Sequence, residues 1–120
     1  SAEFVDCGIE KQAENPDRFA ITCPWQDNSG KNQDYNDLPP QHLWLERGKW
    51  YSIEVAHYTD PSNAGTKLWI DGHLVLDHTG HSMTSWKVDS VWLGTCIKDS
   101  GITGTLYFDD FVMSTSYIGP

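Results

Sequence analysis

The dipeptide Asp71-Gly72 separates two apolar, strand-like runs, residues 66–70 and 73–77, and it constrains the fold more than any other feature of the chain. An Asp-Gly connection of two residues is typical of a type I′ turn, because both central residues of that turn need a positive φ. The backbone twist of such a turn matches the twist of two antiparallel strands. We therefore expect a β-hairpin over residues 66–77.

The segment before this hairpin alternates with a period of two residues. Between Lys49 and Tyr58, one set of residues is Tyr51, Ile53, Val55 and His57, and the other is Trp50, Ser52, Glu54, Ala56 and Tyr58. Successive side chains of a strand point to opposite faces of a sheet, so we expect the first set to face a core.

Further strands are expected over residues 3–9, 18–23, 42–46, 86–95 and 105–113. Residues 24–41 are polar and rich in turn-forming residues, which predicts a long surface loop, and residues 47–48 and 60–65 predict turns. Only residues 10–16 offer a weak helical pattern, and they are too few and too polar for a stable helix. Eight or nine short strands predict one all-β domain over residues 1–120, an antiparallel two-sheet sandwich.

Composition excludes several classes of protein. The 120 residues include 8 basic and 17 acidic side chains, for a net charge of -9, so binding to nucleic acid or to an anionic membrane surface is not expected. No apolar run approaches the roughly 20 residues that span a bilayer. The hydrophobic share of 38% excludes an intrinsically disordered chain.

The three cysteines, Cys7, Cys23 and Cys96, leave the redox compartment open. Cys7 and Cys23 lie in two neighbouring predicted strands and could form a disulfide, and the alternative is three buried thiols. Their spacing does not match a zinc site.

Three motifs in residues 48–120 carry a family resemblance. They are Gly-Lys-Trp-Tyr-Ser-Ile-Glu-Val at 48–55, Lys-Leu-Trp-Ile-Asp-Gly-His-Leu-Val-Leu-Asp at 67–77, and Gly-Thr-Leu-Tyr-Phe-Asp-Asp-Phe-Val-Met-Ser-Thr at 104–115. This part of the chain resembles concanavalin A-like jelly-roll domains, and it is similar to the C-terminal half of polysaccharide-lyase and heparin-lyase-I-like proteins. The resemblance implies a jelly-roll sandwich, a polysaccharide ligand, and an extracellular or periplasmic location.

The chain departs from this family in two ways. A Gln-Ile-His strand, an Arg-rich strand and a Tyr-Phe-Lys-Ala-Gly segment are absent, which argues against lyase catalysis. Only 47 residues precede Gly48, fewer than in the family, which predicts a reduced sandwich or one completed by a second chain in a homo-oligomer. Open sheet edges would favour such pairing.

The six tryptophans divide by their phase in the predicted strands. Trp69 alternates with Leu68 and Ile70 and should point away from whatever those two residues bury, and Trp50 and Trp86 are likewise out of phase with their apolar neighbours. Trp44 and Trp92 are expected in packing. Aromatic rings stack on sugars while polar groups fix the orientation of the ligand. The predicted carbohydrate-binding residues are Trp25, Trp50, Tyr58, Lys67, Trp69 and Trp86.

The histidines and carboxylates have weaker patterns. His73 and His78 are five residues apart, which on a regular strand places them on opposite faces, and His81 follows a predicted turn, so we expect turn histidines rather than a metal site. Asp109 and Asp110 could ligate a structural Ca²⁺, whereas the alternative is an Asp that caps backbone amides at a kink. No other cofactor is expected.

These observations predict a non-catalytic polysaccharide-binding module. One alternative is a polysaccharide lyase or its remnant, in which His57, Tyr58 or Lys67 would perform acid–base chemistry. The other is a structural β-sandwich completed by oligomerisation.

Overall fold

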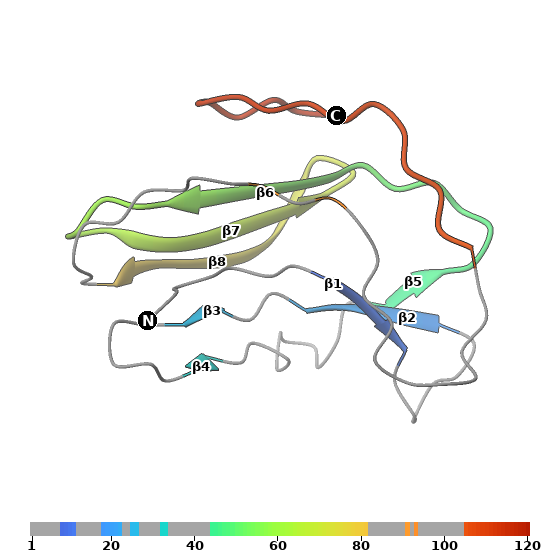
Figure 1. Cartoon of the computed structure of the whole chain (residues 1–120), viewed down its shortest axis with the longest axis horizontal. Coiled ribbons are helices and arrows are strands. Elements are labelled where there is room, and N and C mark those ends of the chain that lie inside the picture. Colours follow the sequence, from blue (N-terminus) through green and yellow to red (C-terminus); the bar gives the residue numbers. More distant parts are fainter. Residues whose placement is uncertain are drawn as a thin grey trace.

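A computed structural model describes residues 8–11, 18–22, 25–26, 32–33, 44–81, 91, 93 and 105–120, with side chains described for 44–80, 91, 93 and 105–120. Every regular element among these residues is a β-strand (Figure 1). The strands are β1 (Gly8–Lys11), β2 (Arg18–Thr22), β3 (Trp25–Gln26), β4 (Asn32–Gln33), β5 (Trp44–Glu46), β6 (Ile53–Tyr58), β7 (Ala64–Ile70) and β8 (His73–His81). The expected all-β class is therefore confirmed.

The strands form three antiparallel groups. β1, β2 and β5 make one three-stranded sheet, β3 and β4 pair with each other, and β6, β7 and β8 make a second three-stranded sheet. The first two N-terminal strands pair with each other, with Ile9 opposite Ile21. Strands β3 and β4 correct the prediction that residues 24–41 form one irregular loop, because cross-strand pairing of Trp25 with Gln33 interrupts it.

The hairpin of β7 and β8 is confirmed at the predicted turn. Asp71 and Gly72 have φ values of 49° and 76°, as a type I′ turn requires. The turn is also joined to the residue before β6, because the amide of Ser52 donates to Asp71 Oδ1 at 2.9 Å and the amide of Asp71 donates to the carbonyl of Ser52 at 2.9 Å. These two bonds hold the start of β6 beside the hairpin.

β8 does not run in a constant register against β7. Leu76 pairs with Leu68 and Leu74 pairs with Trp69, so Val75 is an additional residue on β8, and a second irregularity lies between the pairs of Ala64 and Thr66. Such bulges bend a strand and re-aim its side chains. Gly65 lies at the second one, with a φ of 146°, and a Cβ atom there would lie 1.9 Å from the carbonyl oxygen of His78.

The core of the described residues is centred on β7. Its fully buried members are Ala64, Thr66 and Leu68, and Leu45, Ile70 and Leu76 are nearly buried. Leu45 comes from β5, so the core joins the β1–β2–β5 sheet to the β6–β7–β8 sheet. Ile53 and Val55 lie on the predicted core face, since they pair with Ile70 and Leu68, but as residues of an edge strand they remain 42% and 41% exposed.

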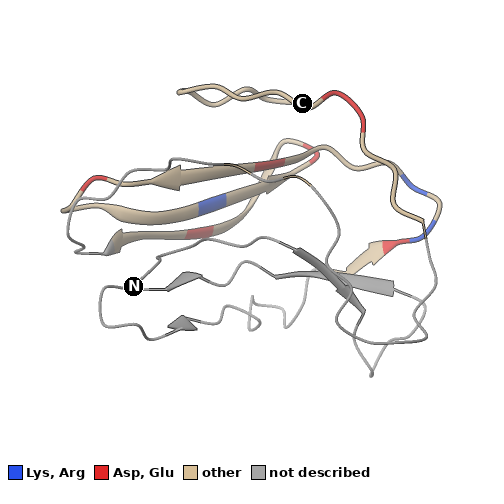
Figure 2. Ribbon diagram, viewed as in Figure 1, with Lys and Arg blue, Asp and Glu red and all other residues tan. Residues whose placement is uncertain are grey.

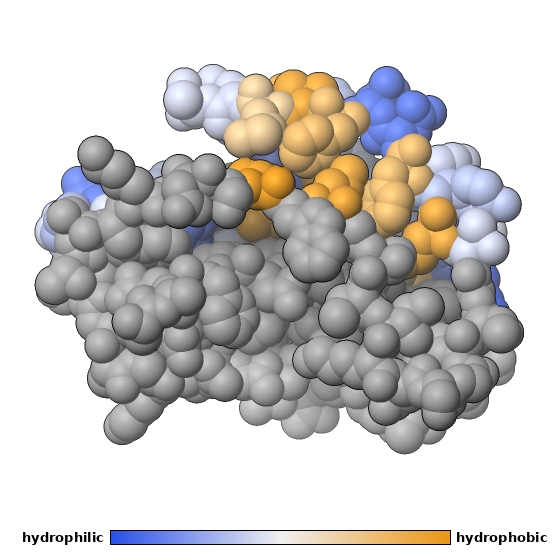
Figure 3. Space-filling view, viewed as in Figure 1, coloured by the Kyte–Doolittle hydropathy of each residue, from blue (hydrophilic) through white to orange (hydrophobic). Residues whose placement is uncertain are grey.

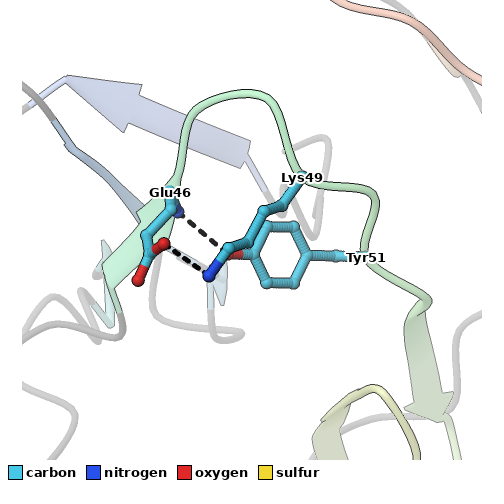
Figure 4. Close-up of polar contacts among 3 residues, drawn as sticks. All are labelled: Glu46, Lys49 and Tyr51. Atoms are coloured by element: carbon cyan, nitrogen blue, oxygen red, sulfur yellow. Dashed lines mark hydrogen bonds and ion pairs between the residues drawn. The ribbon is translucent and has the colours of Figure 1, made fainter.

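The connection from β5 to β6 turns at Arg47 and Gly48, as predicted, and polar contacts fix it (Figure 4). The amide of Glu46 donates to the hydroxyl of Tyr51 at 3.0 Å, and Lys49 Nζ lies 2.5 Å from Glu46 Oε2. The Tyr51 ring also packs against the core, so this turn connects the two sheets.

The predicted strand over residues 105–113 is wrong, because residues 105–120 contain no assigned strand. Asp110 has a φ of 51°, outside the β region, and its amide donates to Asp109 Oδ1 at 3.0 Å. This local hydrogen bond agrees with the second prediction for the Asp pair, an Asp that caps a backbone amide at a kink. Several apolar side chains of the segment are exposed (Figure 3): Leu106, Tyr107, Phe108, Phe111, Val112, Met113, Tyr117 and Ile118.

Candidate functional site

One face of the β6–β7–β8 sheet points away from the core, and we call it the outer face. Two rows of cross-strand neighbours cross it, Glu54–Trp69–Leu74 at the hairpin end and Ala56–Lys67–Asp77 further along the strands. Tyr58 follows Ala56 on the same face of β6. The opposite face carries Leu68, Ile70 and Leu76, which belong to the core.

Trp69 points to the outer face, as its phase predicts. Its sequence neighbours Leu68 and Ile70 are 0% and 8% exposed, whereas Trp69 is half-buried. Its ring lies 5.1 Å from the ring of Tyr117, centroid to centroid, with the planes tilted by 43°. Tilted aromatic pairs at this distance are stabilising beyond their buried area.

A polar group occupies the other end of the outer face. Lys67 Nζ lies 3.4 Å from Asp77 Oδ2 and 5.7 Å from the centroid of the Tyr58 ring, so one ammonium contacts both a carboxylate and an aromatic ring. Figure 2 shows a basic segment on β7 and acidic segments on β6 and β8. The three contacting side chains come from three different strands.

Asp77 is held in its charged form by its surroundings. The hydroxyl of Thr79 donates to Asp77 Oδ1 at 2.7 Å, and this bond, together with the ion pair to Lys67, lowers the pKa of Asp77 below 3.8. A hydrogen bond to the ionised carboxylate favours that form over the neutral acid. Asp77 is therefore a fixed anion at neutral pH, and it orients Lys67.

The hairpin end of the outer face holds the C-terminal residues. The amide of Ile118 donates to Glu54 Oε1 at 2.8 Å, and the amide of Gly119 donates to Glu54 Oε2 at 3.1 Å. Both oxygens of one carboxylate thus bind adjacent peptide groups. Pro120 lies against Gly72 of the turn. A Cβ atom on Gly72 would be 3.0 Å from Cγ of Pro120.

The structure brings together three of the six predicted carbohydrate-binding residues, Tyr58, Lys67 and Trp69. Trp50 is 69% exposed and lies in the connection before β6. Trp25 begins β3, but its side chain lies outside the described residues. Four other residues named in the predictions lie wholly outside them: Trp86, Trp92, Cys7 and Cys23. Trp44, predicted to pack inside, is half-buried in β5.

The predicted placement of His73 and His78 on opposite faces is wrong. His73 pairs with Ile70 and His78 with Thr66, and these partners are four residues apart in a strand, so they share a face. The bulge at Val75 shifts the phase between the two histidines. Among the described residues, Asp109 and Asp110 included, no group of three or more His, Cys, Asp or Glu side chains converges as a metal site would.

His57 lies on the core side of the sheet rather than on the outer face. Its Nδ1 atom is 3.2 Å from Thr66 Oγ1, and burial lowers the pKa of its imidazole below 6.5. Tyr58, its neighbour in β6, points to the other face, so the two side chains do not line one cleft. This arrangement agrees with the alternation expected for adjacent strand residues.

Sequence reasoning missed the part that Glu54 and Tyr117 play at this face. The phase of β6 places Glu54 outward, but its partners are 64 and 65 positions away in the chain. No local pattern of residues signals such a contact. Tyr117 and its ring partner Trp69 are likewise far apart in sequence.

Comparisons with known proteins found no match to a protein-family model, to a curated protein or to a solved structure. In the part of the chain that the structure describes, no helix has the length and apolar character needed to cross a membrane.

Proposed function

We propose that this chain is a polysaccharide-binding domain of concanavalin A-like, jelly-roll type, and that it binds its ligand without catalysis through the outer face of the β6–β7–β8 sheet. One observation carries the proposal: Tyr58, Lys67 and Trp69, from two strands, share this face and lie beside the charged Asp77. The resemblance of residues 48–120 to polysaccharide-lyase proteins supports the choice of ligand.

The chemistry of these side chains suits a sugar ring. The indole of Trp69 offers a flat apolar surface for the C–H face of a pyranose, while Lys67, Asp77 and the Tyr58 hydroxyl offer donors and acceptors for hydroxyl groups. Alternate residues of a strand are about 7 Å apart. A ligand on Trp69 therefore lies within reach of Lys67, the next outward residue of β7.

The charge of the face favours a neutral polysaccharide. The outer face carries two carboxylates, Glu54 and Asp77, and one ammonium, Lys67, and the whole chain has a net charge of -9. A strongly anionic polymer would be repelled by this field, since few cations are available to offset it. We therefore expect weaker binding of alginate or heparin than of a neutral glucan, mannan or xylan.

Affinity electrophoresis in gels that contain each of these polysaccharides tests the proposal. The unmodified chain should be retarded by at least one neutral polymer, and Trp69→Ala should lower that affinity by about 10-fold or more, since the apolar area that a sugar and the indole bury together contributes about 1.5–3 kcal/mol. Tyr107→Ala is the control, because Tyr107 is 75% exposed in the C-terminal segment. Unchanged mobility of the unmodified chain in every gel would contradict the proposal.

Self-association is a second candidate function, and the exposed apolar side chains of Phe111, Val112 and Met113 favour it. Phe111, Val112 and Met113 are 58%, 58% and 67% exposed, and contiguous apolar surface of this kind is typical of an interface. We propose that a second copy of the chain covers it. Light scattering across a range of concentrations should show a dimer that Val112→Asp disrupts, and a monomer at all concentrations would contradict this.

A further inference from the structure

The last four residues, Tyr117 to Pro120, lie along the hairpin end of the outer face, and we call them the C-terminal strap. Three contacts hold the strap. The Glu54 carboxylate accepts the amides of Ile118 and Gly119 at 2.8 and 3.1 Å, the Tyr117 ring lies 5.1 Å from that of Trp69, and Pro120 lies against Gly72. Figure 1 shows the C-terminal segment beside β6 and the sheet.

The strap occupies the surface that a ligand would use. An aromatic platform can stack with only one partner on a given area, and Tyr117 already packs against Trp69. The strap also directs the Glu54 carboxylate to peptide amides, so that this carboxylate is engaged while the strap is in place. A sugar at Trp69 and the strap in its present position therefore compete.

The strap is also held weakly enough to move. Tyr117 and Ile118 remain 53% and 48% exposed, and the hydrogen bond of the Ile118 amide is itself exposed to solvent. Exposed hydrogen bonds and few buried contacts are typical of segments that open locally. Release of the strap would leave the strand pairs of β6, β7 and β8 intact, because the strap takes part in none of them.

We infer that the C-terminal strap is a displaceable cover of Trp69, and that it lowers the apparent affinity of the outer face for its polysaccharide. The covering itself depends only on the contacts described, whereas the effect on affinity rests on the proposed function. If the strap is closed about ten times more often than open, its release strengthens binding about 10-fold, since the apparent dissociation constant scales inversely with the competent fraction.

Glu54→Gln is the first test variant. The amide group keeps the shape of the carboxylate but replaces one acceptor oxygen with a donor NH₂, which cannot bind a peptide N–H. Asp110→Asn is the matched control, because it makes the same carboxylate-to-amide change at an exposed position of residues 105–120. Acrylamide quenching of tryptophan fluorescence measures how accessible the indoles are to solvent. The difference between each protein and the same protein carrying Trp69→Phe gives the contribution of Trp69.

Tyr117→Ala is the second variant, with Tyr107→Ala as its control, and it keeps the test valid if Glu54→Gln perturbs β6. We expect both strap variants to increase the quenching of Trp69 and to bind the polysaccharide about 10-fold more tightly, while both controls behave as the unmodified chain. Unchanged quenching in both strap variants would overturn the inference. Increased quenching with an unchanged, measurable affinity would overturn the competition between strap and ligand.

The two proposals fail in different ways. If Trp69 becomes more accessible in the strap variants but no protein binds any polysaccharide, the cover is established and the proposed function is wrong. If the unmodified chain binds but quenching does not change, the proposed function stands and the cover is wrong.

Discussion

Leu74 and Leu76 lie two positions apart in β8, yet Leu74 is 50% exposed and Leu76 only 7% exposed. Residues at this spacing in a regular strand share one face. The bulge at Val75 separates them, because Leu74 pairs with Trp69 on the outer face and Leu76 pairs with Leu68 over the core. A single additional residue thus assigns two identical side chains to different surfaces of the sheet.

This relationship predicts different effects of one substitution at the two positions. Leu76→Ala removes buried methyl groups from the core and should lower the free energy of unfolding by about 2–4 kcal/mol. Leu74→Ala removes a half-exposed side chain and should lower it by less than about 1 kcal/mol. Urea unfolding followed by circular dichroism measures both. Equal losses would show that the bulge does not separate the two residues.

Gly65 should not tolerate a side chain. It has a φ of 146°, which residues with a Cβ rarely adopt, and a Cβ there would lie 1.9 Å from the His78 carbonyl oxygen. Gly65→Ala should lower the free energy of unfolding by about 3 kcal/mol or more, because backbone strain and a steric clash add. Gly48→Ala is the control: it also has a positive φ, 73°, but an open environment, and should cost about 1 kcal/mol. A smaller loss at Gly65 than at Gly48 would contradict this packing.

The imidazole of His57 should make stability depend on pH in the mildly acidic range. Burial lowers its pKa in the folded state below 6.5, so the unfolded chain binds a proton more readily. The contribution of neutral His57 to stability is present above pH 6.5 and is lost as the pH falls through the folded-state pKa. NMR titration of the His57 ring should give that lower pKa, and His57→Gln should reduce the loss of stability between pH 7 and pH 5. An unchanged pH dependence in His57→Gln would contradict the prediction.

Thr79 should affect the Asp77 carboxyl more than Lys67 does. The hydroxyl of Thr79 is the larger cause of the lowered pKa of Asp77, and the ion pair with Lys67 is a lesser one. Thr79→Val, which keeps the side-chain shape, should therefore raise the pKa of Asp77 toward 3.8 by more than Lys67→Met does. Carboxyl NMR titration checks the order. The stability that the lowered pKa of Asp77 contributes is present above pH 3.8 and is lost as the pH falls through the folded-state pKa. A larger rise in Lys67→Met would reverse this assignment.

Local patterns predicted much of the β6–β7–β8 sheet. The Asp71-Gly72 turn required two positive φ values and has them, and the alternation of Leu68, Trp69 and Ile70 placed the indole away from the core. Both features depend on interactions within a few residues, where turn geometry and a period of two leave little freedom. The same alternation placed Tyr58 on the face opposite Ile53 and Val55.

Other features were predicted wrongly or not at all. The alternation that worked in β7 failed in β8, where the bulge at Val75 brought His73 and His78 to one face. The apolar run over residues 105–113 predicted a strand, but the kink at Asp110 takes the backbone out of the β region. Bulges and kinks depend on the partner strand and on local hydrogen bonds, which a period of two does not record.

The sequence by itself determined the all-β class, the hairpin and the outward direction of Trp69, because each follows from short-range backbone geometry and side-chain polarity. Only the tertiary structure decided which residues contact Trp69 and its neighbours on the outer face. Glu54 binds the amides of Ile118 and Gly119 across 64 and 65 positions of the chain, and Tyr117 packs against the indole. Such contacts depend on where the folded chain returns, since hydrogen bonds and ring packing act over a few ångströms of space and not along the sequence.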